Sequence, residues 1–335
     1  MLIKKMLNLI KNLFIGLTLL FYFSIVSANQ PTFNQWLNEF KSTAKQNGIS
    51  EKTINDLLTD VVYLKKVIEY DNRQPEFFEK TKTYIGKRTS KRAVKKALII
   101  LEENKSTFEK VEKEFNVDKE ILLALWSTET NFGNNLGKMD IVSSLATLSF
   151  DKRRSKFFTG ELLTLLKLVD KNIIKKETLY GSWAGALGNF QFMPSSISNH
   201  ALDYDKDGYI DLKGSKPDAI ASAANYIKKI GWKKNAPCFD QVIFNKHINE
   251  LYFNHSARNI KNKKKINNWK KMGIVFTNDK NNNNNLIGAL VLPDGDKSSP
   301  KFIVYENYEL ILKWNRSLRF GLTICTLAEL IKNEI

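Results

Sequence analysis

The spacing of apolar residues predicts that the first part of the protein is helical. Within residues 29–118, Phe33, Trp36 and Phe40 recur at the intervals of an amphipathic helix. A second long helix is expected from Lys91 onward, with apolar residues on one face and lysines elsewhere. Apolar faces of this kind must be buried, so we interpret residues 29–118 as a helical domain.

The pattern changes in the second half of the chain. Residues 119–235 alternate Gly-rich turns with short helical stretches, and they contain no alternating strand pattern. Residues 236–312 contain three short β-like runs, which are Gln241–Phe244, Leu286–Leu292 and Lys301–Tyr305, with a turn signal at Pro293-Asp294-Gly295-Asp296. Residues 313–335 return to helical spacing. The expected fold is mainly α (α+β), with a small β-containing domain at 236–312 and a separate C-terminal segment at 313–335.

The first 28 residues have the layout of a secretory signal peptide. Lys4, Lys5 and Lys11 form a basic region. The apolar run Leu13–Val26 follows, and Ala28 ends a small-residue cleavage site. A retained membrane anchor is the alternative, but the run is shorter than the roughly 20 apolar residues of a membrane span. We therefore expect cleavage and export, without a lipid anchor because no cysteine lies near the cleavage site.

Charge and cysteine content narrow the choice of partners. The formal net charge is +17, which is typical of proteins that bind a polyanion. The alternative explanation is that Lys and Asn are abundant throughout this sequence. Export argues against nucleic acid as that partner. Cys238 and Cys325 lie 87 positions apart, and a disulfide is conceivable after export. Such spacing does not reveal a pairing, and we expect two unpaired, partly buried thiols.

The run DKEILLALWSTETNFG carries the strongest candidate for chemistry. Asp118 is a good N-cap for a helix, and Gly133 is placed to end it. Ile121, Trp126 and Glu129 fall on the same apolar face of that helix. Burial and the negative end of the helix dipole would both raise the pKa of this carboxyl, which suits a general acid. The alternative is an ordinary glutamate that turns back to solvent at the helix end.

Several separated motifs resemble the membrane-bound lytic murein transglycosylase B family, over almost the whole chain after residue 28. The motifs are ALWSTETNFG, SSLATLSFDKRRSKFF, GSWAGALGNFQFMPSS, DYDKDGYIDLKGSKPDAIASAANYIKKIGW and VYENYELILKWNRS, preceded by RQPEFF. The resemblance implies a lysozyme-like catalytic core at residues 119–235. It also implies cleavage of the β-1,4 bond between N-acetylmuramic acid and N-acetylglucosamine in peptidoglycan, with formation of a 1,6-anhydromuramoyl end.

In this family one glutamate acts first as acid and then as base, and the motif places that role on Glu129. No cofactor is needed for such catalysis. A hydrolase would require a second carboxylate, and neither Asp140 nor Asp151 stands where the family has a catalyst. A muramidase or a non-catalytic peptidoglycan-binding scaffold are the alternatives. The expected partner is the glycan strand, not nucleic acid. The expected protein is a periplasmic monomer, and contacts with cell-wall synthesis proteins are left open.

The resemblance also implies which residues contact the glycan. These residues are Ser182, Gln191, Phe192, Tyr226, Trp314 and Asn315. Trp314 departs from the family pattern, which often has Tyr at this position. The exchange keeps an aromatic surface for a sugar ring, but it removes the hydrogen bond that a tyrosine hydroxyl could form. Asn189-Phe190 departs from the small residue often found before Gln191, which puts the shape of one subsite in doubt. Closely spaced glycines in the same segment would allow the backbone to approach a ligand.

A loop rich in aspartate is a candidate metal site. Asp203, Asp205 and Asp207 have the spacing of the first ligands of an EF-hand loop, and the carbonyl of Tyr209 falls at the seventh position. The twelfth position holds glycine in place of the usual bidentate Glu. The family uses this loop as a calcium site that a later aspartate completes, which here matches Asp218. A plain polar turn is the alternative, and Asp218 also has the place of a capping residue for the next helix. We expect structural rather than catalytic Ca²⁺.

Overall fold

The computed structural model describes residues 31–72, 79–277 and 283–335. The helices are α2 (Phe33–Gln46), α3 (Glu51–Leu58), α4 (Lys65–Asp71), α5 (Thr81–Arg88), α6 (Lys91–Glu103), α7 (Lys105–Phe115), α8 (Lys119–Thr130), α9 (Ile141–Phe150), α10 (Ser155–Asp170), α11 (Pro194–His200), α12 (Lys216–Lys229), α13 (Ile266–Met272), α14 (Glu306–Trp314) and α15 (Leu318–Lys332). None of these helices is long and apolar enough to span a membrane. The predicted signal peptide at 1–28 and the motif RQPEFF lie outside the described residues.

Two sheets accompany the helices. The strands are β1 (Met139–Asp140), β2 (Tyr180–Gly181), β3 (Phe239–Phe244), β4 (Lys264–Lys265), β5 (Ile274–Phe276), β6 (Ile287–Val291) and β7 (Lys301–Val304). β1 pairs with β2, and the other five form an antiparallel sheet in the order β4-β6-β7-β3-β5. β3, β6 and β7 coincide with the three β-like runs of the sequence. The sheet and α13 enclose their own small core around Trp269, which is fully buried.

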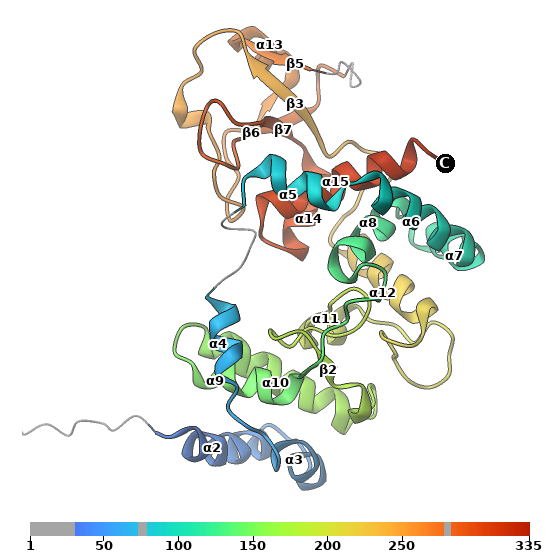
Figure 1. The fold of residues 1–335 in the computed structure, drawn as a ribbon, viewed down its shortest axis with the longest axis vertical. Coiled ribbons are helices and arrows are strands. Elements are labelled where there is room, and N and C mark those ends of the chain that lie inside the picture. The colour runs from blue at the N-terminus through green and yellow to red at the C-terminus, as the bar shows by residue number, and fades with distance from the viewer. Residues whose placement is uncertain (1–30, 73–78, 278–282) are drawn as a thin grey trace, which may run out of the picture.

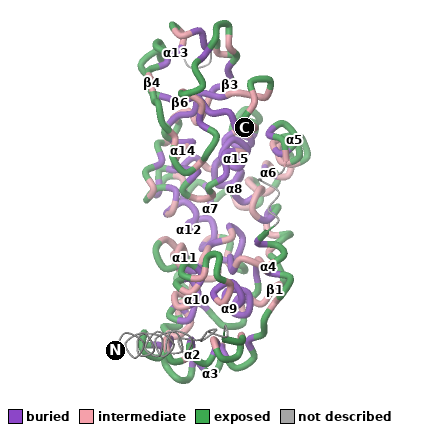
Figure 2. The backbone as a smooth tube through the Cα atoms, turned by 90° about the vertical axis from the view of Figure 1, so that its left-hand side faces the viewer, coloured by how far each residue is buried: buried purple, intermediate pink, exposed green. Residues whose placement is uncertain are grey.

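The two ends of the molecule are joined through a buried pair of helices. In Figure 1 the five-stranded sheet lies at one end and α2 and α3 lie at the other. α8 and α15 pack against each other between them, and both are largely buried in Figure 2. The run Ile121–Trp126 in α8 is buried on every side, which is why this helix occupies the centre of the fold. The segment 313–335, whose helical spacing the sequence predicts, therefore supplies half of the pair.

The ends of α8 differ from the prediction in two respects. The Asp118 carboxylate forms no capping bond within its helix but accepts hydrogen bonds from Trp232 Nε1 at 2.8 Å and from Asn235 N at 3.2 Å. The helix also ends before Gly133, because Asn131 already adopts the left-handed conformation with φ 50°. Asparagine tolerates this conformation better than most residues, so it ends the helix two positions earlier than expected.

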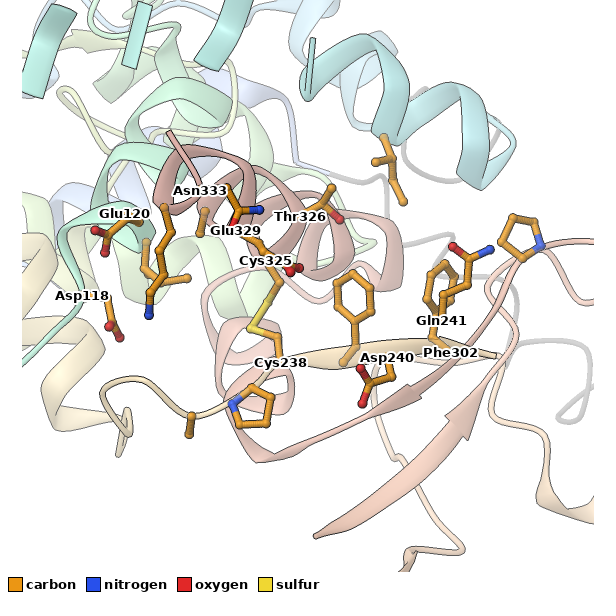
Figure 3. Close-up of a pocket in the computed structure, with 18 of the residues that line it drawn as sticks. Asp118, Glu120, Cys238, Asp240, Gln241, Phe302, Cys325, Thr326, Glu329 and Asn333 are labelled. Atoms are coloured by element: carbon orange, nitrogen blue, oxygen red, sulfur yellow. A yellow bond between two sulfur atoms is a disulfide. The ribbon is translucent and has the colours of Figure 1, made fainter. Parts of the chain in front are cut away.

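The expectation of two unpaired cysteines is wrong. Cys238 and Cys325 form a disulfide, with their Cα atoms 6.1 Å apart. Cys238 directly precedes β3 and Cys325 lies in the middle of α15, so the bond joins the sheet to the buried helix pair (Figure 3). The spacing of 87 residues could not show this pairing, because it depends on how the sheet folds back onto α15.

Candidate active site

Glu129 lies in the last turn of α8 and is half-buried. Its Oε1 accepts a hydrogen bond of 2.9 Å from the indole Nε1 of Trp314, at the end of α14. A donor at this distance fixes the orientation of the carboxyl group and favours its ionised form. The two residues are 185 positions apart in the chain, and the structure brings them together as the resemblance implies.

Aromatic rings continue from Trp314 away from the carboxylate. The Trp314 ring stacks on Tyr226 of α12 with centroids 4.8 Å apart, and Tyr226 stacks on His200 at 4.2 Å. Phe192 meets the Trp314 ring edge-on at 5.4 Å. Burial raises the pKa of the Tyr226 phenol, whose hydroxyl donates to Lys313 O at 3.3 Å. The result is a rigid aromatic surface beside Glu129, of the kind that packs against the apolar face of a sugar ring.

Polar groups lie on the loops that border this surface. Gln191 has a left-handed backbone, with φ 50°, and its amide donates to Gly188 O at 2.9 Å and Leu136 O at 3.3 Å. Because both amide hydrogens are used, the side-chain carbonyl of Gln191 is the group suited to accept a bond from a hydroxyl. Ser182 follows β2, and its Oγ accepts from Ala186 N at 2.9 Å, which leaves the hydroxyl able to donate.

Asn315 is half-buried and follows α14 directly, next to Trp314. Its backbone carbonyl accepts from Ser317 N at 2.8 Å, which closes a tight turn after the helix. The predicted residues thus fall into one connected group around Glu129: Phe192, Tyr226 and Trp314 by ring contacts, and Asn315 by adjacency to Trp314. Ser182 and Gln191 belong to the Gly-rich loops from which Phe192 also comes.

Comparison with known proteins identifies the family of the chain. The family described as "Transglycosylase SLT domain" matches residues 32–329. The chain belongs to this family. Membrane-bound lytic murein transglycosylase B of Escherichia coli (strain K12) is 32% identical over 225 residues, a match that covers 64% of this chain and 60% of that relative. The family predicted from the motifs is therefore confirmed.

Solved structures of family members share the fold. SltB3 from Pseudomonas aeruginosa, in complex with NAG-anhNAM-pentapeptide, is 30% identical with a TM-score of 0.80, and the match covers 90% of this chain and 80% of that one. Escherichia coli Slt35 in complex with calcium is 25% identical with a TM-score of 0.74, covering 92% of this chain and 94% of that one. The expected mainly helical fold with a lysozyme-like core is thus confirmed for this transglycosylase-family chain.

The aspartate loop of this family member gathers only part of the predicted ligand set. Carboxylate oxygens of Asp203, Asp205 and Asp218 lie within 4.8 Å of one another. Asp207 is not in this cluster, and its carboxylate accepts a bond from Tyr209 N at 3.0 Å. The carbonyl of Tyr209 stays a predicted ligand. A set of three carboxylates fits a hard cation such as Ca²⁺.

Asp218 holds the loop together from within. It is fully buried, and its carboxylate accepts from the backbone N–H groups of Tyr204, Asp205 and Asp211 at 2.7, 3.3 and 3.0 Å. Burial raises the pKa of the Asp218 carboxyl, although these donors and any bound cation favour the ionised form. Its carboxylate forms no capping box: Ser215 Oγ caps α12 by accepting from the Asp218 backbone N–H, and Ser215 N donates to Asp211 O instead.

Sequence reasoning missed Asn189, which had been noted only as a departure from the family pattern. Its buried Oδ1 accepts from Trp126 Nε1 at 3.0 Å, and its Nδ2 donates to Leu212 O at 2.9 Å and Lys213 O at 3.0 Å. Its carbonyl accepts from Thr130 Oγ1 at 2.7 Å. Asn189 therefore fixes the last turn of α8, which carries the glutamate, to the aspartate loop. The sequence offered one signal for this role, which is the position of the Asn189 amide directly after the glycine-rich turn.

A pocket of about 1040 Å³ lies elsewhere, between the sheet, α5, α8 and α15. The disulfide lines it, together with Asp118, Glu120 and Asp240 (Figure 3). Neither Glu129 nor any predicted glycan-contacting residue lines this pocket. Its acidic side chains are engaged in contacts within the fold, such as that of Asp240 Oδ2 with the Tyr305 hydroxyl at 2.5 Å.

Proposed function

We propose that this protein is a lytic transglycosylase that cleaves the β-1,4 bond between N-acetylmuramic acid and N-acetylglucosamine of peptidoglycan and leaves a 1,6-anhydromuramoyl end. The observation that carries the proposal is the half-buried Glu129 with its carboxyl group held by Trp314 beside an aromatic surface. Family membership supports the same reaction, and the relative SltB3 was solved with a fragment that contains anhNAM.

In the proposed reaction one carboxyl group acts twice. Protonated Glu129 gives its proton to the glycosidic oxygen while the bond from that oxygen to the anomeric carbon breaks. The acetamido oxygen of the substrate stabilises the electron-poor carbon. The C6 hydroxyl of the muramic acid then attacks that carbon, and the ionised Glu129 takes the hydroxyl proton, which restores the enzyme. The Trp314 N–H would stabilise the carboxylate between the two steps.

The two aspartates that follow Glu129 most closely in the chain are engaged locally, which favours a transglycosylase over an ordinary hydrolase. An ordinary glycosidase uses a second carboxylate to activate water or to form a covalent intermediate. Asp140 is the N-cap of α9, where its carboxylate accepts from Ser143 N at 2.6 Å. Asp151 follows the same helix and accepts from Arg153 N at 3.0 Å. Both candidates thus accept hydrogen bonds from local backbone N–H groups.

Two further proposals concern the setting of the enzyme. We propose that the aspartate loop binds Ca²⁺ through Asp203, Asp205 and Asp218, with Asp207 and the Tyr209 carbonyl as the further ligands, and that the ion stabilises the loop without taking part in the reaction. The clustering of the first three carboxylates supports this, and the relative Slt35 was solved with calcium. We also propose export to the periplasm through a cleaved signal peptide at residues 1–28, where the enzyme would meet its glycan substrate as a monomer. N-terminal sequencing of the mature protein, expected to begin near Asn29, tests the second proposal.

The ends of the product decide the reaction class. Purified peptidoglycan would be digested with the enzyme, and the soluble fragments would be analysed by mass spectrometry. Anhydromuramoyl ends, which are one water lighter than reducing ends, are expected. Fragments with reducing ends would show a muramidase, and the absence of fragments would favour a binding scaffold.

A further inference from the structure

The backbone that follows Glu129 has a rare conformation. Asn131, Phe132 and Gly133 come one after another at the end of α8, with φ of 50°, 57° and 80°. Asparagine and glycine adopt this left-handed conformation readily, but for a bulky residue such as Phe132 it is strained. Such strain persists only where the surrounding structure fixes it, and it is concentrated at functional sites. The turn 131–133 must therefore be held in place by its neighbours.

Lys96 of α6 contacts two of the three residues in this turn. Its Nζ donates hydrogen bonds to Asn131 O at 2.9 Å and to Asn131 Oδ1 at 3.0 Å. The same ammonium group lies 5.4 Å from the centroid of the Phe132 ring, which is buried against Trp126 with the two rings 5.7 Å apart. One partly buried lysine thus ties the strained turn to a neighbouring helix.

The charge of Lys96 also stabilises the end of α8. The C-terminal end of a helix carries partial negative charge, and a cation that bonds its last carbonyls is favourable there. α8 has no basic residue in its own last turn. Asn134 Nδ2 also donates to Asn131 O, at 3.0 Å, but this group is neutral and belongs to the same loop. Lys96 therefore supplies, from α6, the positive charge that the sequence of α8 lacks.

The turn that Lys96 holds includes Glu129. Asn131 N donates to Ser127 O at 2.9 Å, which closes the last turn of α8 around the glutamate. A shift of Asn131 is passed to Glu129 two residues earlier, whereas Trp314 is carried by the separate helix α14. The 2.9 Å hydrogen bond between Trp314 and Glu129 therefore depends on a turn that Lys96 fixes.

We propose that Lys96 is a positioning residue for the reaction, and that it acts through Glu129 rather than on the glycan itself. It keeps the last turn of α8 rigid, so that the carboxyl group stays in place while it gives and retakes a proton. The inference rests on the proposed function, because that function makes Glu129 the acid and base. A displacement of about 1 Å, caused by a change away from the chemistry, can cost roughly 100-fold in rate. Loss of Lys96 should thus lower kcat and leave KM nearly unchanged.

Kinetics of Lys96 variants on purified peptidoglycan test the inference. Lys96→Met keeps a stem of similar length without the ammonium group, and its kcat should fall roughly 10-fold to 100-fold, with KM within about twofold of the wild type. Lys96→Arg keeps the charge and can donate to both oxygens of Asn131, so its kcat should stay within about threefold of the wild type. Lys95→Met is the matched control, since Lys95 is the exposed neighbour in α6, and it should change neither constant.

Each variant would be assayed at a temperature at which its melt shows folded protein. Lys96→Gln keeps a hydrogen-bond donor without the charge, so its kcat should lie between those of the methionine and arginine variants. It carries the test if Lys96→Met does not fold. A merely structural role would lower the melting temperature but leave the kcat of the folded protein unchanged.

The positioning role is overturned if folded Lys96→Met has a kcat within about twofold of the wild type, or if its loss appears in KM instead. An arginine variant as slow as the methionine variant, or a Lys95→Met control that is equally slow, would also overturn it. Mass spectrometry of the fragments separates this inference from the proposed function. Anhydromuramoyl ends released at full rate by Lys96→Met refute only the positioning role. Reducing ends from the wild type refute only the reaction class, and no fragments from the wild type refute both.

Discussion

The hydrogen bond from Trp314 to Glu129 gives a sharp prediction for Trp314→Phe. Phenylalanine keeps an aromatic ring for the stack with Tyr226 but has no N–H to donate. A hydrogen bond of 2.9 Å to a carboxylate contributes about 1.5–3 kcal/mol. We take the whole of this free energy to stabilise the carboxylate that forms as the glycosidic bond breaks. The loss of the bond should then lower kcat roughly 10-fold to 150-fold, at about 1.4 kcal/mol for each factor of ten.

Trp314→Tyr is the matched control for this variant. Its hydroxyl can donate a hydrogen bond again, so its kcat should recover toward that of the wild type, whereas that of Trp314→Phe stays low.

Kinetics on purified peptidoglycan would separate these effects, with soluble fragments quantified by chromatography at several substrate concentrations. A raised KM with an unchanged kcat would mean that Trp314 serves only as a binding surface for the sugar. A kcat within twofold of the wild type would refute the role given to the N–H group.

Three further predictions concern stability. Cys238→Ser/Cys325→Ser should lower the free energy of unfolding by about 4–5 kcal/mol, because the disulfide closes a loop of 87 residues. A thermal melt of the reduced wild type should show the same loss. Equal melting temperatures for the oxidised wild type and the variant would exclude a stabilising disulfide. Calcium at 100 times its Kd should stabilise the protein by roughly 2.7 kcal/mol, and Asp203→Ala should abolish this effect. Chelation should leave activity at low temperature nearly unchanged, so immediate inactivation on chelation would contradict a purely structural role. Asn189→Ala should cost about 3 kcal/mol in chemical denaturation because it leaves buried partners such as Trp126 Nε1 unsatisfied, and a loss below 1 kcal/mol would contradict the role of this amide.

Local patterns in the sequence predicted the elements well. Apolar spacing placed Glu129 at the end of a buried helix, because that spacing depends on the helix alone. Lys264–Lys265 escaped prediction as a strand, since two lysines carry no β pattern and the strand exists only by pairing with β6. The end of α8 was misplaced for a similar reason, because Gly133 has the stronger intrinsic preference but Asn131 takes the left-handed position.

Contacts between distant segments were beyond such reasoning. The pairing of Cys238 with Cys325 and the bond from Trp314 to Glu129 both need the sheet and the last two helices to be in place. Family resemblance placed Trp314 in the cleft, but it suggested neither this hydrogen bond nor the pairing of the cysteines. The aspartate loop shows an intermediate case: spacing along the chain suggested Asp203, Asp205 and Asp207 as ligands, and of these the fold gathers Asp203 and Asp205 with the distant Asp218, while Asp207 stays a prediction.

The most direct test of the central claim is the activity of Glu129→Gln beside Glu120→Gln. Both glutamates lie on α8, but Glu120 is near the opposite end, paired with Lys119 at 3.3 Å. Peptidoglycan turnover would be measured for both variants after a melt has shown that each is folded. Loss of the acid and base should reduce turnover by roughly 10²–10⁴-fold in Glu129→Gln, with Glu120→Gln within a few-fold of wild type. Glu129→Gln that still releases anhydromuramoyl fragments at more than about a tenth of the wild-type rate would contradict the assignment of Glu129 as the catalyst.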